Sequence, residues 1–438
     1  MASKIDKGEV LSKFFDDGVY TPLYAGGAVS AACGWANGQQ AYAVYQDGAP
    51  VDARDVEKCI RVLKLAAATG DPVVTFYNST GAKLAGGLDV LTAVSELNAE
   101  IGRLSGVVPQ IAAVIGVCGG TSALAAANAD LCIMAEDAQL FFTAPFTSAA
   151  AGDKAENAGS AAAAAKAGVA AMTVGTAAEA AELAARMVGM LPANNLTGPA
   201  VFEFEEPAAA FAAGDPVKAA EALADKDSLL EVYAGYGKNL YAAFATINGN
   251  AVGIVATGKT LCHNCVAKAA RFVRLCDAFS VPVVTVVDTE GFVSSCSDDI
   301  AGGIREAARL TATYADATNV RVALLAGHAV GPVYTAFAAA DLRIAVAGCL
   351  VAPVDPKVAA SVLYKDEIEA SDSIASATAA KAAAYASESC SAEAAVAAGA
   401  ADVSCDADGA RAAVVTALDL LATKRASRLP KKHGNMAL

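Results

Sequence analysis

The pattern of apolar and polar residues predicts alternating helices and strands in the first part of the chain. Apolar side chains at helical spacing predict a helix over Asp55 to Ala68, and a run of β-branched and aromatic residues from Val73 to Tyr77 predicts a buried strand after it. A second helix, Val90 to Leu104, leads to a strand at Ile111 to Ile115. A glycine-rich turn, a short helix and a strand at Leu131 to Met134 follow. This order is typical of a β-α-β unit.

The same order returns about 210 residues later. Pro72-Val73-Val74-Thr75 recurs as Pro282-Val283-Val284-Thr285, an offset of 282 − 72 = 210, and Gly120 recurs as Gly331, an offset of 331 − 120 = 211. The elements predicted in the second half are a helix at Lys268 to Phe279, strands at Val283 to Val287 and Val322 to Leu325, and a helix after Val333. We therefore predict an α/β protein of two tandem domains of one fold, residues 1–205 and 206–438.

Three stretches fall outside this regular pattern. Leu191 to Asp227 is rich in Pro, Asn, Asp and Glu, and predicts a linker with one short strand at Val201 to Phe204. Ala149 to Ala185 is alanine-rich with scattered charges, and predicts a mobile loop followed by an exposed helix. By charge alone, the basic tail from Lys424 to Lys432 is interpreted as a solvated terminus.

Composition and charge exclude several classes of partner. The chain has 438 residues, 55% of them hydrophobic, a mean hydropathy of +0.42 and a net charge of −14, so nucleic acid and anionic membrane surfaces are not expected as direct partners. Val107 to Ala129 and Val322 to Ala340 are long enough for a membrane span, but their Gly, Pro and Ala content favours buried elements. Because the first 17 residues have no apolar segment of signal-peptide type, we expect a cytoplasmic protein.

Side chains for acid–base or metal chemistry are scarce. The three histidines, His263, His328 and His433, are too few for a Ser-His-Asp relay or a histidine-rich site, so no metal is predicted. Eleven scattered cysteines predict reduced thiols and no disulfides. The segment Cys262-His263-Asn264-Cys265 has CxxC spacing. Without a second pair it does not complete a zinc site, so a surface turn with two thiols is preferred to a metal or redox role.

The duplicated glycine turns offer a different chemistry. Each follows a predicted strand and opens a predicted helix, where the first backbone N–H groups have no partner within the helix and lie at its positive end. Two such amides can hold a carbonyl oxygen that becomes an enolate. A dinucleotide-type turn or close helix packing is the alternative. Because the turn occurs twice, we predict two oxyanion holes for two carbonyl-bearing reactants.

Several longer motifs carry a family resemblance. They are Ser105-Gly106-Val107-Val108-Pro109-Gln110-Ile111, Gly116-x-Cys118-x-Gly120, Lys268-Ala269-Ala270-Arg271-Phe272 with Cys276-Asp277-Ala278-Phe279, Val287-Asp288-Thr289-x-Gly291-Phe292, and the ending Thr423-Lys424-Arg425 with Lys431-Lys432-His433-Gly434-Asn435. They resemble the carboxyltransferase subunit of biotin-dependent acyl-CoA carboxylases and decarboxylases, the family of propionyl-CoA carboxylase beta and of methylmalonyl-CoA and glutaconyl-CoA decarboxylase alpha. The resemblance runs from about Leu11 to Leu438 and makes the basic tail a closing motif.

This resemblance implies two crotonase-like domains, each a spiral of ββα units, with the active site between the N-terminal domain of one subunit and the C-terminal domain of another. It implies an enzyme that moves CO2 between carboxybiotin and an acyl-CoA. Coenzyme A would contact Ser79, Thr80, Gly81, Ala82 and Lys83, and biotin would contact Gly291, Phe292 and Tyr334. The oxyanion positions fall on Gly120, Thr121, Gly331, Pro332 and Val333.

The resemblance also implies partners. The sequence has neither a biotin-attachment segment nor an ATP-grasp region, so a biotin carboxyl carrier protein and a biotin carboxylase or membrane decarboxylase subunit would be separate chains. The chain would form a homo-oligomer, dimer or hexamer, or a hetero-oligomer with a paralogue. It would not itself insert into a membrane.

The chain departs from the family pattern at the implied site. Thr80 and Thr121 replace glycine, Lys83 replaces arginine, Glu290 replaces proline, and Val354-Asp355-Pro356-Lys357 replaces a glycine-bearing turn. Pro332 matters most, because proline has no N–H and leaves only Val333, or Gly331 in a shifted pose, as a donor. Loss of one such donor typically costs about 2.7–4 kcal/mol of transition-state stabilisation.

These departures leave two alternative functions open. A catalytically weakened or inactive paralogue could serve as a structural or regulatory subunit of a hetero-oligomeric carboxylase or decarboxylase. An acyl-CoA hydratase or hydrolase would need nearby carboxylates, for which the candidates are Glu136, Asp137, Asp298 and Asp299. Charged turns are usually only solvated, so this alternative ranks last. Single residues also have structural alternatives to a functional role. These are helix packing for Tyr334, a surface position for Lys83, and a structural ion pair for Arg271 and Asp277.

Overall fold

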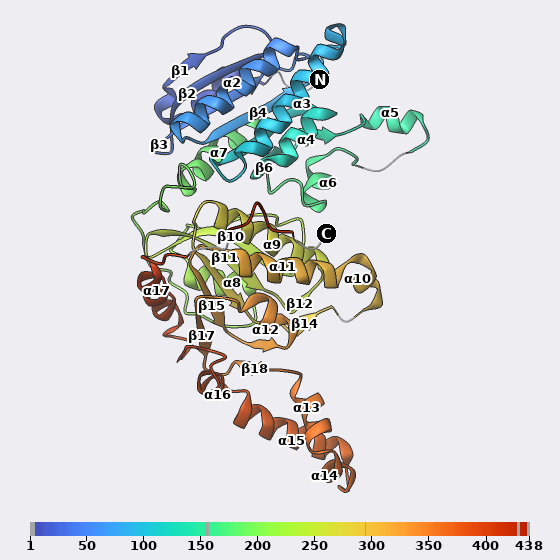
Figure 1. The fold of residues 1–438 in the computed structure, drawn as a ribbon, viewed down its shortest axis with the longest axis vertical. Coiled ribbons are helices and arrows are strands. Elements are labelled where there is room, and N and C mark those ends of the chain that lie inside the picture. The colour runs from blue at the N-terminus through green and yellow to red at the C-terminus, as the bar shows by residue number, and fades with distance from the viewer. Residues whose placement is uncertain (1–4, 154–156, 294, 427–429, 436–438) are drawn as a thin grey trace. The chain divides into compact units, whose positions relative to one another are not determined.

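The computed structural model describes all residues except 1–4, 154–156, 294, 427–429 and 436–438, and it divides the chain into two compact units (Figure 1). Unit 1 is Met1–Ala200 with Val232–Tyr236, and unit 2 is Val201–Glu231 with Gly237–Leu438. The chain leaves unit 1 after Ala200, close to the predicted domain boundary after residue 205, which remains a prediction.

Unit 1 is built on one mixed sheet with helices on it. Across the sheet the strands run β1 (Tyr20–Leu23), β2 (Val29–Ala36), β3 (Gln39–Gln46), β4 (Val73–Ser79), β5 (Gln110–Gly119), β6 (Leu131–Ala135) and β8 (Met172–Val174), and β7 (Gln139–Phe141) pairs with the end of β5. The first three strands are antiparallel and the others are parallel. The helices are α1 (Lys7–Phe14), α2 (Ala53–Thr69), α3 (Gly87–Leu104), α4 (Thr121–Asn128), α5 (Pro145–Ala150), α6 (Ala161–Lys166) and α7 (Ala177–Met190), with short 3-10 turns η1 (Asp16–Gly18) and η2 (Leu84–Gly86).

Unit 2 repeats this plan. Its main sheet has the order β19 (Val403–Cys405), β17 (Leu342–Val346), β15 (Arg321–Leu325), β13 (Val283–Val287), β11 (Asn250–Thr257), β10 (Leu240–Ile247) and β9 (Leu230–Glu231), and two short pairs join β12 (Thr260–Leu261) to β14 (Gly291–Phe292) and β16 (His328–Val330) to β18 (Leu350–Ala352). The helices are α8 (Pro216–Leu223), α9 (His263–Ala278), α10 (Cys296–Ala301), α11 (Gly303–Asp316), α12 (Pro332–Phe337), α13 (Pro356–Leu363), α14 (Lys365–Glu369), α15 (Ile374–Ser389), α16 (Ala392–Ala397) and α17 (Ala410–Leu421).

The two units are copies of one fold at the offset that the sequence predicts. Adding 211 to the bounds of β2, β3, β6 and β7 reproduces the bounds of β10, β11, β17 and β18, for example 29 + 211 = 240. The parallel pair Val117↔Gln139 recurs as His328↔Leu350. The predicted fold of tandem, crotonase-like ββα domains is confirmed.

The central strands are almost entirely buried, as expected for a parallel sheet covered by helices. All five residues of β6 and of β13 are buried. Alanine is frequent in the core, and α7 buries Ala180, Ala181, Ala184 and Ala185, so small side chains bring the helices close to the sheet.

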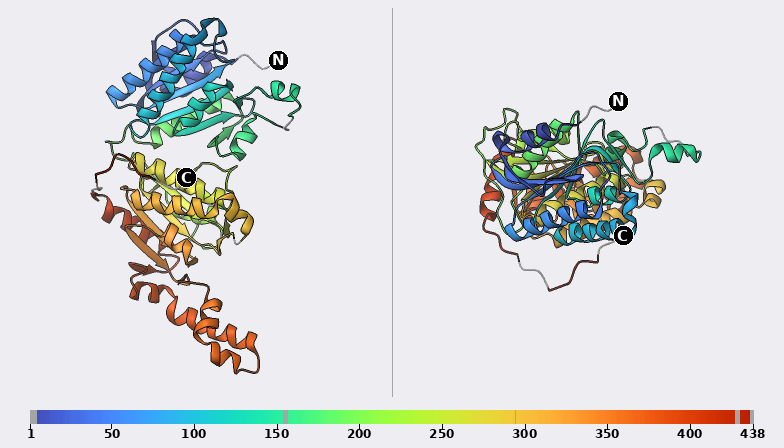
Figure 2. Two further views of the ribbon diagram at one scale, coloured as in Figure 1. Left: turned by 45° about the vertical axis from the view of Figure 1, so that its right-hand side comes forward. Right: turned by 90° about the horizontal axis from the view of Figure 1, so that it is seen from above.

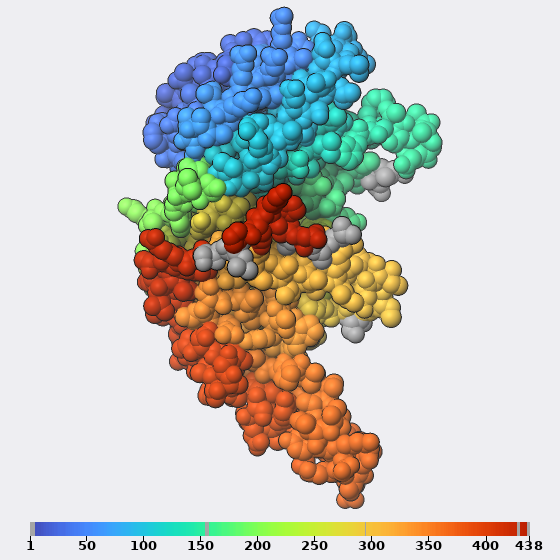
Figure 3. Space-filling model, viewed as in Figure 1, coloured from blue at the N-terminus to red at the C-terminus, as the bar shows by residue number. Residues whose placement is uncertain are grey.

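Unit 2 differs from unit 1 by an insertion after the second glycine turn. From β18 to β19 the offset grows from 211 to 403 − 172 = 231, and α13, α14 and α15 occupy this stretch. These helices pack mainly on one another and project from the rest of unit 2 in the ribbon views (Figure 2). The space-filling view shows the same projection (Figure 3).

Several predictions outside the repeat are wrong. The predicted linker Leu191 to Asp227 does contain the change of unit after Ala200, but it also contains α8, whose alanines are buried, and Val201 forms one isolated bridge with Asn250 instead of a strand. The helix expected to be exposed near Ala185 is the buried helix α7, because its alanines face the sheet and not solvent. The basic tail is anchored at its start, where Lys424 Nζ lies 2.7 Å from Asp341.

No helix in the described part of the chain is both long and apolar enough to cross a membrane.

Candidate functional site

The glycine turn of unit 1 has a conformation that only glycine adopts easily. Gly120 lies between β5 and α4 with φ 61° and ψ −129°, outside the regions open to residues with a Cβ atom. Its N–H donates to the Phe141 carbonyl at the end of β7, at 2.9 Å. The Gly120 N–H, which was predicted as an oxyanion donor, is therefore already used in a structural hydrogen bond.

The glycine turn of unit 2 has the same geometry. Gly331 has φ 54° and ψ −122°, and its N–H donates to the Ala352 carbonyl at the end of β18, also at 2.9 Å. Both pairs obey the same offset, since 331 − 120 and 352 − 141 are 211. Donation from Gly331 in a shifted pose therefore conflicts with this hydrogen bond.

The amides that remain for a ligand lie one to three residues after each glycine. In unit 1 they are the N–H groups of Thr121 and Ser122, and no hydrogen bond from either is found within the described residues. In unit 2 the position equivalent to Thr121 is Pro332, which has no N–H, so the first two N–H groups of the helix are those of Val333 and Tyr334. Ser122 and the Tyr334 main chain were not predicted. A strict count of helix positions from each glycine would have identified them.

The loops predicted to bind coenzyme A and biotin are also copies of each other. In unit 1 the Gly81 N–H donates to Ser79 Oγ and the Lys83 N–H to the Val51 carbonyl. In unit 2 the Gly291 N–H donates to Thr289 Oγ1 and the Val293 N–H to the Leu261 carbonyl. Thr80, Ala82 and Lys83 are exposed.

The sheet brings each loop next to the glycine turn of its own unit. Ser79 pairs with Cys118 on β5, two residues before Gly120. Phe292 of the unit 2 loop and Pro332 of its glycine turn line one cavity. Each unit therefore joins two predicted site segments that lie about 40 residues apart in the sequence.

The cavity in unit 2 contains a polar pair that the sequence interpretation missed. It has a volume of about 300 Å³, and most of its lining is apolar, including Leu261, Val266 and Phe292. His263 and Asp298 also line it, and His263 Nδ1 lies 2.6 Å from Asp298 Oδ1. Since a carboxylate only accepts, Nδ1 carries the proton, and Nε2 is the ring nitrogen available to a ligand. The two residues lie 35 positions apart, so spacing alone did not connect them.

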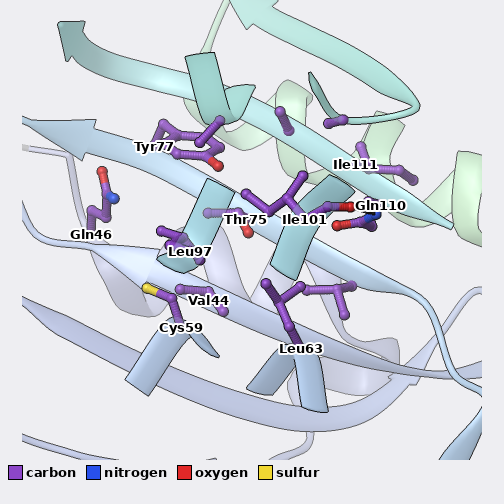
Figure 4. A pocket seen from close by; sticks show the side chains of 14 residues that line it. Val44, Gln46, Cys59, Leu63, Thr75, Tyr77, Leu97, Ile101, Gln110 and Ile111 are labelled. Atoms are coloured by element: carbon purple, nitrogen blue, oxygen red, sulfur yellow. Dashed lines mark hydrogen bonds between the residues drawn. The ribbon is translucent and has the colours of Figure 1, made fainter. Parts of the chain in front are cut away.

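A second cavity lies in the core of unit 1 and is not a substrate site. It lies between β3, β4 and β5 and the helices α2, α3 and α4, where Gln46, Thr75 and Gln110 are its polar residues (Figure 4). Its volume is about 30 Å³, which suffices for about one water. Gln110 Nε2 donates to the Ile101 carbonyl at 3.0 Å. These polar groups therefore belong to the packing of the core.

Other predicted residues have structural partners. The Tyr334 hydroxyl donates to the Ala400 carbonyl at 2.7 Å and accepts from Arg343, which favours the packing alternative over contact with biotin. Asp277 accepts hydrogen bonds from the Thr318 and Asn319 N–H groups, which is a structural role. The other carboxylates considered for a hydratase, Glu136 and Asp137, are exposed in the turn between β6 and β7.

Comparison with known proteins identifies the family. The sequence model of the carboxyl transferase domain family matches residues 8–436 of this chain. The chain belongs to the carboxyl transferase family. The methylmalonyl-CoA carboxyltransferase 12S subunit of Propionibacterium freudenreichii subsp. shermanii is 32% identical over 428 residues, 91% of this chain and 82% of the relative. The methylmalonyl-CoA decarboxylase subunit alpha of Veillonella parvula is 29% identical over 491 residues, 99% of this chain and 93% of the relative.

The family's solved structures have the same fold. The crystal structure of transcarboxylase 12S, with methylmalonyl-coenzyme A and methylmalonic acid bound, superposes with a TM-score of 0.90 at 28% identity, over 98% of this chain and 92% of that one. The predicted family and activity class, carboxyl transfer between biotin and an acyl-CoA, are confirmed. The catalytically inactive alternative is not favoured by these relatives.

Proposed function

We propose that main-chain amides at the starts of the two equivalent helices, α4 and α12, hold the two oxygens that gain negative charge during carboxyl transfer. The Thr121 and Ser122 amides would receive the thioester oxygen of the acyl-CoA, and the Val333 and Tyr334 amides would serve the biotin side. The observation that carries this proposal is the shared conformation of Gly120 and Gly331, with both glycine N–H groups occupied and the next available amides left at the helix start.

The acyl-CoA side is the better equipped of the two. When CO2 leaves or joins the acyl group, the thioester oxygen passes through an enolate, and two N–H donors at the start of the eight-residue helix α4 would stabilise its charge. The exposed loop Thr80 to Lys83 lies beside this turn and offers main-chain groups and one ammonium to coenzyme A. Lys83 provides a point charge for phosphate and not the fork of an arginine.

The biotin side would use the cavity of unit 2. Its volume of about 300 Å³, its apolar wall and the His263–Asp298 pair suit a small ring with a polar edge. Biotin on its carrier protein would supply the nitrogen that bears the carboxyl group. Gly291, Phe292 and Pro332 would orient the ring, and the missing Pro332 amide leaves the Val333 and Tyr334 N–H groups to hold its oxygen.

We further propose a methylmalonyl-type thioester as the substrate and a biotin carrier protein as the partner, because two similar proteins are named for methylmalonyl-CoA. A hexamer is the proposed assembly, as the transcarboxylase 12S structure is described as one. Cytoplasmic location, the direction of carboxyl transfer, and a biotin carboxylase or membrane decarboxylase partner stay predictions.

Transfer of labelled CO2 tests the function. The purified chain is incubated with free biotin or a biotinylated carrier and with malonyl-CoA, methylmalonyl-CoA or glutaconyl-CoA. We expect exchange with at least one thioester, and we expect Thr121→Pro to reduce it. Absence of exchange with every thioester, in a preparation that is folded by circular dichroism, would contradict the proposed activity.

A further inference from the structure

Two thiols occupy the start of helix α9 at close range. Cys262 is the N-cap residue and Cys265 the third residue of the helix, and their Sγ atoms are 3.4 Å apart. The Cys262 side chain makes no capping hydrogen bond. The CxxC segment was predicted to be a surface turn, but it forms the first turn of a helix, and Cys265 is buried.

The matching helix of unit 1 is capped in a different way. Asp52 and Asp55 stand 210 residues before the two cysteines, since 262 − 52 and 265 − 55 are both 210. They form a capping box in which each side chain accepts from the other residue's N–H. Replacing a cap of this type typically costs about 1 kcal/mol of stability. The thiol pair in unit 2 therefore occupies a position where a better helix cap is available.

A lysine accompanies both pairs. In unit 1, Lys58 Nζ donates to the Val29 carbonyl at 2.9 Å and lies 2.8 Å from Asp55. In unit 2 the equivalent Lys268 Nζ donates to the Leu240 carbonyl at 2.8 Å, and Cys265 stands where the carboxylate would be. Within the described residues no ion pair joins Lys268 to a carboxylate.

Burial lowers the pKa of the Lys268 amine. The residue is 2% exposed, and this burial lowers the pKa of its amine to about 8, although the charges of Glu231 and Cys265 act in the opposite direction. With this pKa about a tenth of the Lys268 amines are neutral at pH 7, and this fraction can accept a proton from Cys265. In unit 1 the same position holds a lysine that is paired with a carboxylate.

The two thiols differ in access. Cys262 is partly exposed, whereas Cys265 is 1% exposed and burial raises the pKa of its thiol to about 11. A dissolved reagent can therefore reach Cys262 but not Cys265. This division into an accessible attacking thiol and a buried resolving thiol is what thiol–disulfide exchange requires.

We propose that Cys262 and Cys265 form a thiol–disulfide exchange site that a low-molecular-weight disulfide oxidises. The Cys262 thiolate attacks one sulfur of the reagent, a mixed disulfide forms, and the first reagent thiol leaves. Cys265 then passes its proton to the neutral Lys268 amine and attacks Cys262 Sγ, and the second reagent thiol leaves. The cysteines lose two electrons, which the reagent gains. The sulfurs move from 3.4 Å to the disulfide length of about 2.05 Å.

The exchange site adjoins the cavity of unit 2. His263 lies between the two cysteines and lines that cavity with Phe292 and Pro332. A disulfide between Cys262 and Cys265 would therefore restrict the helix turn that carries the His263 imidazole. The thiol chemistry itself does not depend on carboxyl transfer, so its test is separate from the test of the proposed function.

Defined mixtures of oxidised and reduced glutathione test this proposal on the full chain. After equilibration, free thiols are blocked by alkylation and peptides are identified by mass spectrometry. We expect loss of alkylation at both Cys262 and Cys265 in wild type, with an intramolecular disulfide that joins them. Cys265→Ser should stop at a glutathione adduct on Cys262, and Cys262→Ser should leave Cys265 unmodified.

Two further variants make the outcome decisive. Lys268→Met should slow closure of the mixed disulfide at least about tenfold, because the proton acceptor is removed. The double variant Cys262→Asp with Cys265→Asp copies the capping box of unit 1 and should lose the redox response while retaining the fold. The exposed Cys296 is the internal control and should form only an adduct. A stable glutathione adduct on wild-type Cys262, or two thiols that stay reduced in the oxidised buffer, would overturn the proposal.

Discussion

The two units of this protein share one backbone and differ in the residues placed at its key positions. Unit 1 has a capping box at the start of α2, a lysine paired with a carboxylate, and an amide at the first position of α4. Unit 2 has two thiols, a buried lysine and a proline at the corresponding positions. The hydrogen bonds that define the glycine turns and loops are nearly identical. The comparison shows that the two units keep one main-chain geometry while the side chains at these positions differ.

The lysine pair provides the largest expected contrast. Lys58→Met should lower the free energy of unfolding by about 3–5 kcal/mol, because it leaves the buried Asp55 carboxylate without its cation. Burial works against the charge of Asp55, but hydrogen bonds from Lys58 and the Asp52 N–H outweigh it and keep the pKa of Asp55 below its usual value. Lys268→Met should not show this loss at neutral pH. Urea denaturation measures both, and equal losses would remove the contrast.

The pH dependence of Lys268 should sharpen this contrast. Its pKa is about 8 in the folded protein and 10.5 in the unfolded chain, so the unfolded chain binds more protons between these values and stability should rise with pH across that window. The rise should amount to about 3 kcal/mol relative to Lys268→Met and should flatten above pH 10.5. Parallel wild-type and variant curves between pH 8 and 10.5 would contradict it.

Proline at the start of α4 would make unit 1 resemble unit 2. Thr121→Pro removes one N–H donor, and we expect carboxyl transfer to fall by about 10²–10³-fold in kcat. The fold should persist, because Gly331 precedes Pro332 with nearly the same φ and ψ as Gly120. Thr121→Ala keeps the amide and is the matched control. Similar kcat values for the two variants would argue against the proposed oxyanion donors.

The two glycines should differ when they are replaced by alanine. Each variant should lose about 1–3 kcal/mol of stability, because φ is positive at both positions. Gly331→Ala should lose more, since its new Cβ would lie 3.0 Å from the Pro353 carbonyl oxygen, while a Cβ at Gly120 would meet nothing within 4 Å. Chemical denaturation of both variants gives the order. A larger loss for Gly120→Ala would contradict the steric origin of this order.

Restoring an amide in unit 2 should have the smallest effect. Pro332→Ala adds an N–H at the first position of α12, and we expect kcat to rise about tenfold, with about 0.4–1 kcal/mol less stability because the unfolded chain gains freedom. Steady-state carboxyl transfer and thermal unfolding measure the two effects. An unchanged kcat would mean that the N–H groups of Val333 and Tyr334 already provide all the hydrogen bonds that the biotin oxygen needs.

The sequence by itself determined the repeat, and with it the fold class, the strands and the glycine turns. Local signals suffice there, because a buried parallel strand needs a continuous apolar run and a turn with the φ and ψ of Gly120 and Gly331 needs glycine. The predicted strand Val283–Val287 has the observed bounds. The start of α9 was predicted five residues late, whereas adding 210 to the predicted start of the first helix, Asp55, gives residue 265, two residues from the observed start.

Only the tertiary structure decided which groups are available for chemistry. Whether a glycine N–H is free depends on a carbonyl 21 residues away, as with Gly120 and Phe141 or Gly331 and Ala352. The contact between His263 and Asp298 likewise joins residues 35 positions apart. Burial of Lys268 beside Cys265 depends on strands that pack over α9. Spacing along a chain describes local conformation, but hydrogen-bond partners and desolvation depend on distant segments that meet only in the folded protein.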